Sequence, residues 1–509
     1  MKLGKWSGFA ALTLATGVLL SGCAGAAQSP AASDTLNIAT LSIPQSLDPT
    51  AATGSNVPFF QAVYDTLIRR QANGDFTPML ATKWEYNADN TQLTLTLRDD
   101  VKFHDGTPFN AEAVKANMDR FRTSTGGDSK GLKNISEITV VDPTHVTITL
   151  SAPDPSLLFR LSDSAGLMAN PAAFANPDAL KTTPDGTGPY QLDKSKTVIG
   201  TKWVYDRDPK YWGDKLPYQT LTLSVFDNEN AIVNGLKTGQ IDTALLQSAD
   251  QRAAAKQDAQ LKIQDSNVDV QSIILFDRAG AMVPALGDAR VRQALNYAID
   301  RDTMLKQIRQ GLGTTTSQMF GTDTLGYDKS LDNYYTHDPK KAKELLAEAG
   351  YANGFDLTLP RMAAIVDDAL AASLKADFAA VGVKLTWQDV DQATALKQIF
   401  TDKGFPGLVL SLGQPANDWL MISSQLLPGS FNIFGYTDPE ATELVNKIQH
   451  ESVADSKADA QALNKHIVEQ GWFVPFYRQT YALVTDGSVN VTQQSGMAVP
   501  SIYNYTPAK

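Results

Sequence analysis

The sequence contains only one cysteine, Cys23, among 509 residues. A single thiol excludes a disulfide within the chain and any zinc or iron–sulfur site built from several cysteines. The five histidines offer no alternative, because no two of them stand at the i, i+4 spacing that places two metal ligands on one helix face. These absences predict a protein without a resident metal or cofactor.

Positive charge is also scarce. The chain has 44 Lys and Arg residues against 55 Asp and Glu residues, and its formal net charge is -11. Nucleic-acid binding needs clustered positive charge, and so does direct adhesion to anionic lipid, so neither partner is expected. The length exceeds the roughly 250–300 residues that one hydrophobic core supports, which predicts two or three domains.

No apolar run reaches the roughly 20 residues that a membrane-spanning helix needs. The first apolar run, Phe9–Leu20, is shorter than that and follows the positively charged Lys2 and Lys5. A short apolar stretch behind a basic start is typical of a secretory signal peptide. We therefore expect residues 1–22 to be a leader.

The segment Leu20-Ser21-Gly22-Cys23 closes this run and resembles the lipobox of bacterial lipoproteins. The resemblance implies cleavage before Cys23 and a lipid attached to its sulfur. Acyl chains would then hold an acidic body that an anionic membrane surface does not attract. Residues 23–34, rich in Ala, Ser and Pro, are expected to form a flexible tether. We predict an extracytoplasmic protein that is lipid-anchored to a bacterial membrane, in the periplasm or on the outer face of the cell.

The body of the chain mixes strand and helix patterns. Leu93, Leu95 and Leu97 alternate as in a half-buried strand, and two β-rich runs around Asp142-Pro143 predict a hairpin. Amphipathic helices are expected at 110–121, 288–300 and 338–350, begun by Asn110, Asp288 and Asp338. This mixture predicts an α/β architecture.

Six segments resemble, in the same order, the family 5 extracellular solute-binding proteins, in their dipeptide- and oligopeptide-binding branch. The segments are SLDPT (46–50), VKFHDGTPFNAEAV (101–114), GTGPY (186–190), DPKYWG (208–213), VRQALNYAIDRD (291–302) and HDPKKAKELLAEAGY (337–351). Any one of them would be a weak signal, but their order over more than half of the chain is specific.

The resemblance implies a two-lobed fold of the type II periplasmic-binding-protein kind, with an extra subdomain inserted in lobe I. We expect lobe I at 35–270 and 478–509, the inserted subdomain at about 55–195, and lobe II at 271–477. The chain would cross between lobes twice, near Val268–Asp277 and near Trp472–Val484, two extended apolar stretches that suit paired hinge strands.

The family also implies a function: a monomeric receptor that captures a solute between its lobes and delivers it to the membrane permease of an ABC importer. A peptide is the family's usual ligand, and oligosaccharides or opines are alternatives. A surface-anchored hydrolase is a further alternative, but it needs a nucleophile–base pair or a metal cluster, and the sequence shows neither pattern. We therefore expect a binding protein rather than an enzyme.

Family members take ligand contacts from the first loop of lobe I, where this chain has Gln45, Ser46 and Leu47. A plain proline-bounded loop is the alternative for these three residues. Arg361, after the run FDLTLP, either receives a ligand carboxylate or is an ordinary surface arginine.

Peptide-binding members hold the ligand's amino terminus with an acidic residue of lobe II. The aligned position here falls at Leu412 or Gly413, and neither is acidic. A buried ammonium without a carboxylate partner costs several kcal/mol, so either Asp418 replaces the acid or the ligand lacks a free α-amino group, and we favour the second alternative. Trp419 either stacks on a ligand or fills the core. The predicted contacts in this stretch are Gly413, Gln414, Asp418 and Trp419.

Overall fold

The computed structural model describes residues 34–54, 56–126 and 128–508. The predicted signal peptide and the lipidation site at Cys23 lie outside the described residues, as does the predicted tether apart from Asp34. The chain divides into two units, and all described residues belong to the second of them. Within these residues no helix is both long enough and apolar enough to cross a membrane.

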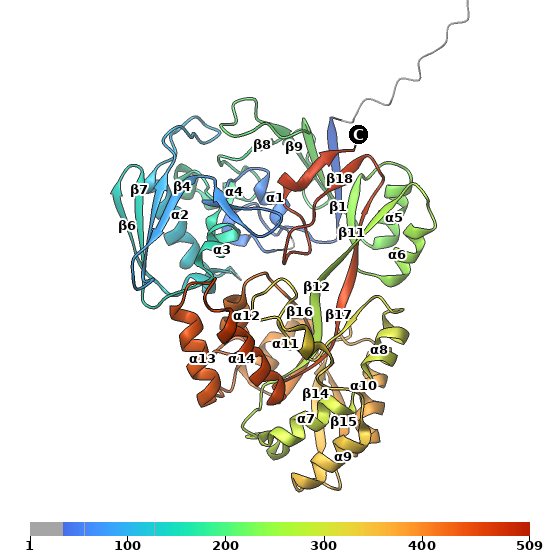
Figure 1. Cartoon of the computed structure of the whole chain (residues 1–509). Coiled ribbons are helices and arrows are strands. Elements are labelled where there is room, and N and C mark those ends of the chain that lie inside the picture. The colour runs from blue at the N-terminus through green and yellow to red at the C-terminus, as the bar shows by residue number, and fades with distance from the viewer. Residues whose placement is uncertain (1–33, 55, 127, 509) are drawn as a thin grey trace, which may run out of the picture. The chain divides into compact units, whose positions relative to one another are not determined.

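A nine-stranded sheet forms the backbone of this unit (Figure 1), with the order β16-β12-β17-β11-β1-β10-β9-β8 and β13 paired to β17. Two of its strands are long, β12 (Lys262–Leu275) and β17 (Phe473–Thr485), and they pair antiparallel along most of their length. The other strands are β1 (Thr35–Thr40), β8 (Tyr190–Leu192), β9 (Lys202–Arg207), β10 (Thr220–Val225), β11 (Thr243–Leu246), β13 (Gly313–Thr315) and β16 (Gly407–Gly413).

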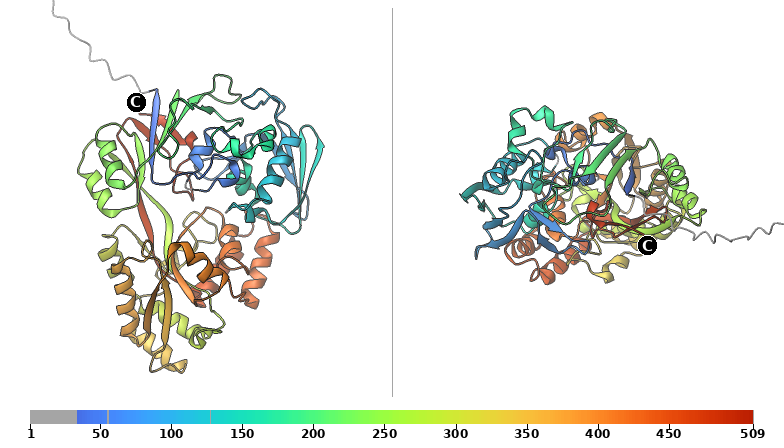
Figure 2. Two further views of the ribbon diagram at one scale, coloured as in Figure 1. Left: turned by 180° about the vertical axis from the view of Figure 1, so that it is seen from behind. Right: turned by 90° about the horizontal axis from the view of Figure 1, so that it is seen from above.

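Strands β12 and β17 connect two lobes and lie side by side from both viewing directions (Figure 1 and Figure 2). In one lobe β17 pairs with β11, and in the other β12 pairs with β16. The register between the two long strands shifts at Asn267/Asp269 and again at Gln271/Ser272. Such bulges bend and twist a strand, so the connection changes direction here. The predicted crossings overlap these strands, although the predicted lobe limits stay a prediction.

In the first lobe, the main sheet packs against short helices. These are α1 (Val57–Gln61), α5 (Glu229–Lys237) and α6 (Ala249–Lys256), and a small hairpin of β18 (Val489–Val491) and β19 (Tyr505–Pro507) lies near the C-terminus. The lobe begins with β1, in which Leu36 and Ile38 are buried.

A second, four-stranded antiparallel sheet follows β1 in the chain, in the order β4-β5-β7-β6. Its own hydrophobic core uses residues between Leu67 and Met168. The elements are β2 (Ile68–Arg70), β3 (Phe76–Pro78), β4 (Ala81–Tyr86), β5 (Gln92–Leu97), α2 (Ala111–Arg122), β6 (Ile135–Asp142), β7 (His145–Leu150), α3 (Leu157–Leu161) and α4 (Pro177–Leu180). The predicted strand, hairpin and helix are confirmed, and the Asn110 side chain accepts a hydrogen bond from the N–H of Ala113 at 3.0 Å.

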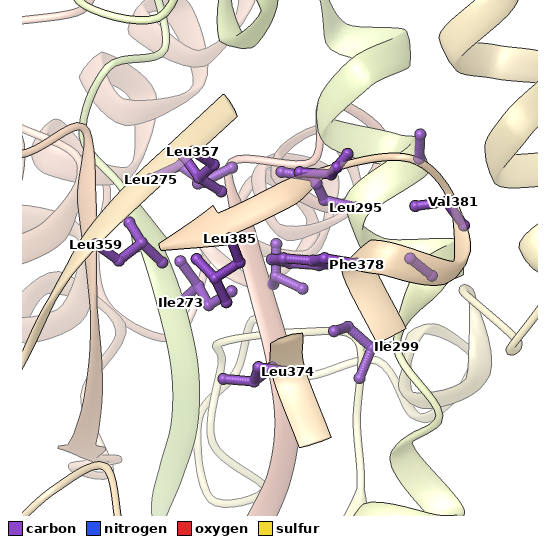
Figure 3. Packing of buried hydrophobic residues seen from close by; sticks show 14 of the residues in the cluster. Ile273, Leu275, Leu295, Ile299, Leu357, Leu359, Leu374, Phe378, Val381 and Leu385 are labelled. Atoms are coloured by element: carbon purple, nitrogen blue, oxygen red, sulfur yellow. The ribbon is translucent and has the colours of Figure 1, made fainter. Parts of the chain in front are cut away.

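The second lobe surrounds the other end of β12, β16 and β17 with helices and a two-stranded parallel sheet of β14 (Asp356–Arg361) and β15 (Lys384–Asp389). Phe378 and Leu374 pack toward Leu385 and Ile273 in its core (Figure 3). The helices are α7 (Ala289–Ala298), α8 (Arg301–Ile308), α9 (Pro339–Glu348), α10 (Asp368–Ala380), α11 (Gln392–Leu396), α12 (Asp418–Gln425), α13 (Pro439–His450) and α14 (Lys457–Glu469).

Two helix predictions have different outcomes. Helix α9 begins after Asp338 as predicted, and Gly350 follows it with φ of 88°, a left-handed conformation that glycine adopts without strain. Helix α7 ends at Ala298 and so is shorter than predicted. The reason is that Asp300 caps the next helix, α8, by accepting a hydrogen bond from the N–H of Thr303.

Two of the recognised motifs meet at a buried carboxylate, Asp65, which is 1% exposed. It accepts hydrogen bonds from the hydroxyls of Thr187, Tyr211 and Tyr503, each at 3.0 Å, and from Trp212 Nε1 at 2.9 Å. Thr187 belongs to GTGPY, whereas Tyr211 and Trp212 belong to DPKYWG. These motifs therefore hold the first lobe together.

Burial raises the pKa of Asp65 to about 6 even though four hydrogen bonds oppose the shift. A raised pKa means that the folded state favours the proton, so the stability that Asp65 contributes is present below about pH 4 and is lost as pH rises through about 6. We compare the free energy of unfolding of the wild type with that of Asp65→Asn. The difference between the two proteins should decrease by up to about 3 kcal/mol from pH 4 to pH 7. Urea titrations of both proteins at pH 4 and pH 7 measure this difference in free energy of unfolding. The same difference at both pH values would contradict the prediction.

Candidate functional site

A cavity of about 580 Å³ lies where β12, β16 and β17 meet the first lobe. Asp269, Gly413 and Tyr481 come from these three strands, and Pro415 and Leu420 follow β16 on the second-lobe side. The first-lobe wall consists of Gly54, Asp128, Phe159, Arg160, Asp163, Ser164, Ala165, Gln247, Gly496, Met497 and Ala498. The cavity is thus bounded by both lobes and by the strands that connect them.

A second hollow of about 1140 Å³ adjoins this cavity and shares the lining residues Asp128, Arg160 and Leu420. Its far side consists of second-lobe residues such as Phe400 and Phe431. Ligand cavities in proteins usually measure about 300–1,000 Å³, and the cavity at β12 falls within this range.

The charged groups of the cavity are mostly acidic. Its ionisable side chains other than tyrosine are Asp128, Asp163, Asp269 and Arg160. Ser164 donates from its hydroxyl to Asp128 at 2.8 Å and from its N–H to Asp163 at 2.8 Å. Three carboxylates against one guanidinium give the cavity an excess of negative charge.

Burial raises the pKa of both Asp128 and Asp269, and a hydrogen bond from Ser164 or Tyr481, respectively, opposes the shift only in part. Asp163 has a cationic partner, since the guanidinium of Arg70 lies 3.5 Å from its carboxylate. Apolar side chains such as Phe159, Leu420 and Met497 complete the lining. The site therefore combines apolar walls with a few oriented polar groups, as small-molecule sites generally do.

Of the residues predicted in lobe II, Gly413 lines the cavity and Gln414 does not. Gln414 is buried and donates from Nε2 to the carbonyl of Met319 at 2.8 Å. Gly413 ends β16 and lies opposite Asp269 in the register with β12.

Asp418 and Trp419 are at the start of α12, and both are buried. The Asp418 carboxylate accepts hydrogen bonds from the N–H groups of Leu325 at 3.2 Å and Gly326 at 3.1 Å. It lines a separate hollow beside Phe76 and does not line the cavity at β12. Trp419 is 3% exposed within a second-lobe core cluster, with its edge at the larger hollow. Trp419 thus belongs to the core and also lines the larger hollow, and a ligand role for it stays a prediction.

The first-loop residues and Arg361 do not line the cavity either. Gln45 is exposed, Ser46 accepts from the N–H of Asp48 at 3.0 Å, and Leu47 is 1% exposed in the first-lobe core. Arg361 forms an ion pair with Asp368 and donates to the carbonyl of Val366 at 3.1 Å. A ligand role for these four residues stays a prediction.

Sequence reasoning missed the charged lining residues, namely Asp128, Arg160, Asp163 and Asp269. One signal was available for the last of them. Apart from Asp277 at its last position, Asp269 is the only charged residue in the predicted crossing strand Val268–Asp277. A lone carboxylate in an apolar strand is costly to bury, so it merits attention as a functional group.

Comparison with known proteins identifies the family. The model of bacterial extracellular solute-binding proteins, family 5, matches residues 75–429. The chain belongs to this family. The glutathione-binding protein GsiB of Escherichia coli O1:K1 / APEC is 31% identical over 357 residues, which cover 69% of this chain and 67% of GsiB.

Solved structures show the same fold. HbpA2 from Haemophilus parasuis superposes with a TM-score of 0.81 at 22% identity, covering 93% of this chain and 100% of that one. DppA from Helicobacter pylori, in complex with the peptide STSA, superposes with a TM-score of 0.77 at 21% identity, covering 93% and 98%. The predicted two-lobed α/β fold is confirmed.

Family 5 membership also confirms the predicted class of function. This family 5 protein is a solute-binding receptor of an ABC importer, and its relatives are extracellular binding proteins rather than enzymes. Within the described residues, no group of three or more His, Cys, Asp or Glu side chains is placed to hold a metal ion. The cavity between the lobes is therefore the candidate solute site.

Proposed function

We propose that this protein captures a peptide-type solute in the cavity between its lobes and delivers it, unaltered, to a membrane permease. The observation that supports this most directly is the origin of the lining. Asp269 and Tyr481 come from the connecting strands, Arg160 from the first lobe, and Leu420 from the second. A solute that contacts all of them is held from both sides.

Closure of the lobes then follows from binding. A ligand shifts a conformational equilibrium only through contacts that differ between the two states. Contacts to both lobes are complete only when the lobes approach each other, so the solute favours the closed form. The bulged stretch of β12 beside the cavity is the natural place for the backbone to bend.

The remaining parts of the proposal concern the rest of the chain. We propose lobe I at 35–270 and 478–509 with an inserted subdomain at about 55–195, and lobe II at 271–477. We also propose that the receptor is a monomer, held near its permease by lipid on Cys23 and a tether at 23–34. Mass spectrometry of membrane-extracted protein, compared with Cys23→Ser, tests the anchor.

Isothermal titration calorimetry against peptides, oligosaccharides and opines tests the proposal of solute capture. We expect one solute class to bind with Kd at about the micromolar level, near -8 kcal/mol. X-ray scattering should show a smaller radius of gyration with that solute, and mass spectrometry should recover the solute intact. Cleavage of the solute would favour the hydrolase alternative. If no compound of the panel gives a binding signal in calorimetry or changes the scattering curve, solute capture is contradicted.

A large side chain at Gly413 should block the cavity. A Cβ at this position would have only one neighbour within 4 Å, the Oδ1 of Asp269 at 3.8 Å, so Gly413→Trp can extend into the cavity without displacing backbone. We expect the affinity for the solute to fall at least about 100-fold, because the indole would occupy space in which the solute makes its contacts. The melting temperature of the free protein should change little. Val141→Trp, at an exposed position of β6, is the control, and equal affinity of the two variants would contradict this placement of the site.

A further inference from the structure

Asp269 occupies an unusual position in the wall of the cavity. It lies at a bulge of β12, opposite Gly413 of β16 on one side and Gln479 of β17 on the other. Because glycine has no side chain, nothing on β16 at this position covers the carboxylate. Asp269 therefore combines a position on a connecting strand with an open face toward the cavity.

The carboxylate of Asp269 is only partly satisfied by the protein. Its Oδ2 accepts a hydrogen bond from the Tyr481 hydroxyl at 2.7 Å, and Tyr481 also lies 2.8 Å from Gln479 Oε1. Among residues 34–54, 56–126 and 128–508, no Lys, Arg or His forms an ion pair with Asp269, and its Oδ1 accepts no hydrogen bond. A half-buried carboxylate in this state is destabilised relative to one with a cationic partner.

The other charged groups of the cavity do not provide that partner. Asp128 and Asp163 add negative charge from the opposite wall, and the charge of Arg160 offsets only part of the rise that burial causes in the pKa of Asp128. Asp163 already has Arg70 within 3.5 Å. Asp269, on the connecting strand β12, is thus the carboxylate of the cavity that lacks a cationic partner.

We propose that Asp269, oriented by Tyr481, binds a primary ammonium group of the captured solute. This inference rests on the proposed function and names the chemistry that the same cavity recognises. An ammonium has three N–H donors and a positive charge, so it supplies both the hydrogen bond that Oδ1 lacks and the charge that the cavity lacks. Asp418, whose carboxylate is engaged by two backbone N–H groups, is not needed for this role.

The test compares four proteins by calorimetry: wild type, Asp269→Asn, Asp265→Asn and the double variant Asp269→Asn/Gly413→Asp. Asp265 is the matched control, since it lies on the same strand but is exposed and paired with Arg252 at 2.7 Å. The double variant returns a carboxylate from the neighbouring strand, where the backbone has room for a Cβ. Circular dichroism and melting temperature check that each variant folds.

The probes are a library of tri- and tetrapeptides, each with a free amino terminus and as its N-acetyl form, together with neutral oligosaccharides and dicarboxylates. In the wild type, N-acetylation should weaken binding about 100-fold, as expected for loss of a buried charge pair. Asp269→Asn should lose about the same factor for the free-amine peptide and none for the acetylated form. Asp265→Asn should match the wild type, and the double variant should recover at least part of the lost affinity.

Two results would overturn the inference while leaving solute capture intact. One is equal binding of free and acetylated peptides, or tight binding only of neutral or anionic probes. The other is Asp269→Asn binding a free-amine peptide as tightly as the wild type. If no probe binds and none changes the scattering curve, the proposed function itself fails, and the inference fails with it.

Discussion

Replacing Phe378 by alanine is expected to lower the free energy of unfolding by about 3–5 kcal/mol. Phe378 is 0% exposed and lies on α10, where its ring packs among Leu374, Leu385 and Ile273 (Figure 3). The substitution removes the buried ring and leaves a cavity that the surrounding strands and helices close only in part. Because protein interiors are close-packed, both effects reduce stability.

Urea titration followed by circular dichroism measures this change. Lys375→Ala, at an exposed position of the same helix, is the matched control and should stay within about 0.5 kcal/mol of the wild type. The affinity for solute under native conditions should be unchanged, because Phe378 does not line the cavity. A loss below about 1 kcal/mol would show that this core is not packed as described.

Much of the local structure was predictable because its causes are local. Asn110 and Asp338 each accept a hydrogen bond from the N–H three residues ahead, so short sequence patterns identified both helix starts. The end of α7 was misjudged for a related reason. Asp300 reads as part of a continuing amphipathic pattern, and only the structure shows that its side chain serves the following helix.

The site was harder to predict because it depends on register. Gly413 was identified from a resemblance, but the carboxylate opposite it belongs to Asp269, far away in the chain. No pattern in a single sequence states which residues of two distant strands face each other. The same limit applies to Asp65, whose four donors come from three separate segments. The motifs pointed to the family, whereas the structure shows what they hold together.

Removing Asp332 should be among the most damaging changes near the connecting strands. Its Oδ1 accepts hydrogen bonds from Arg478 Nη1 at 2.7 Å, Thr316 at 2.8 Å and Gln318 at 2.8 Å, and its Oδ2 accepts one from Tyr327 at 2.6 Å. The side chain of Arg478, on β17, is 2% exposed. Asp332→Ala would leave this guanidinium buried without its counter-charge, which typically costs about 3–5 kcal/mol.

Removing Arg478, the other member of the pair, should lower the free energy of unfolding by less than removing Asp332. Arg478→Met keeps an apolar stem of similar length and leaves Asp332 with three neutral donors and with 16% of its side chain exposed. We therefore expect Asp332→Ala to be more destabilising than Arg478→Met in urea titrations at neutral pH. If Arg478→Met were the more destabilising of the two, the unpaired Asp332 carboxylate, rather than the unpaired Arg478 guanidinium, would be the costlier group to leave buried.

The pH dependence provides an independent check of the same pair. Burial by itself raises the pKa of Asp332, but the charge of Arg478 and the hydrogen bonds from Tyr327, Arg478 and Thr316 outweigh it and hold the pKa below its usual value. A lowered pKa means that the pair stabilises the fold above the pKa of the unfolded chain, about 3.9, and that this contribution is lost as pH falls through the folded-state value. The difference in free energy of unfolding between the wild type and Asp332→Ala should therefore narrow on acidification below about pH 4. A difference that stays constant down to about pH 2 would show that folding does not lower the pKa of Asp332.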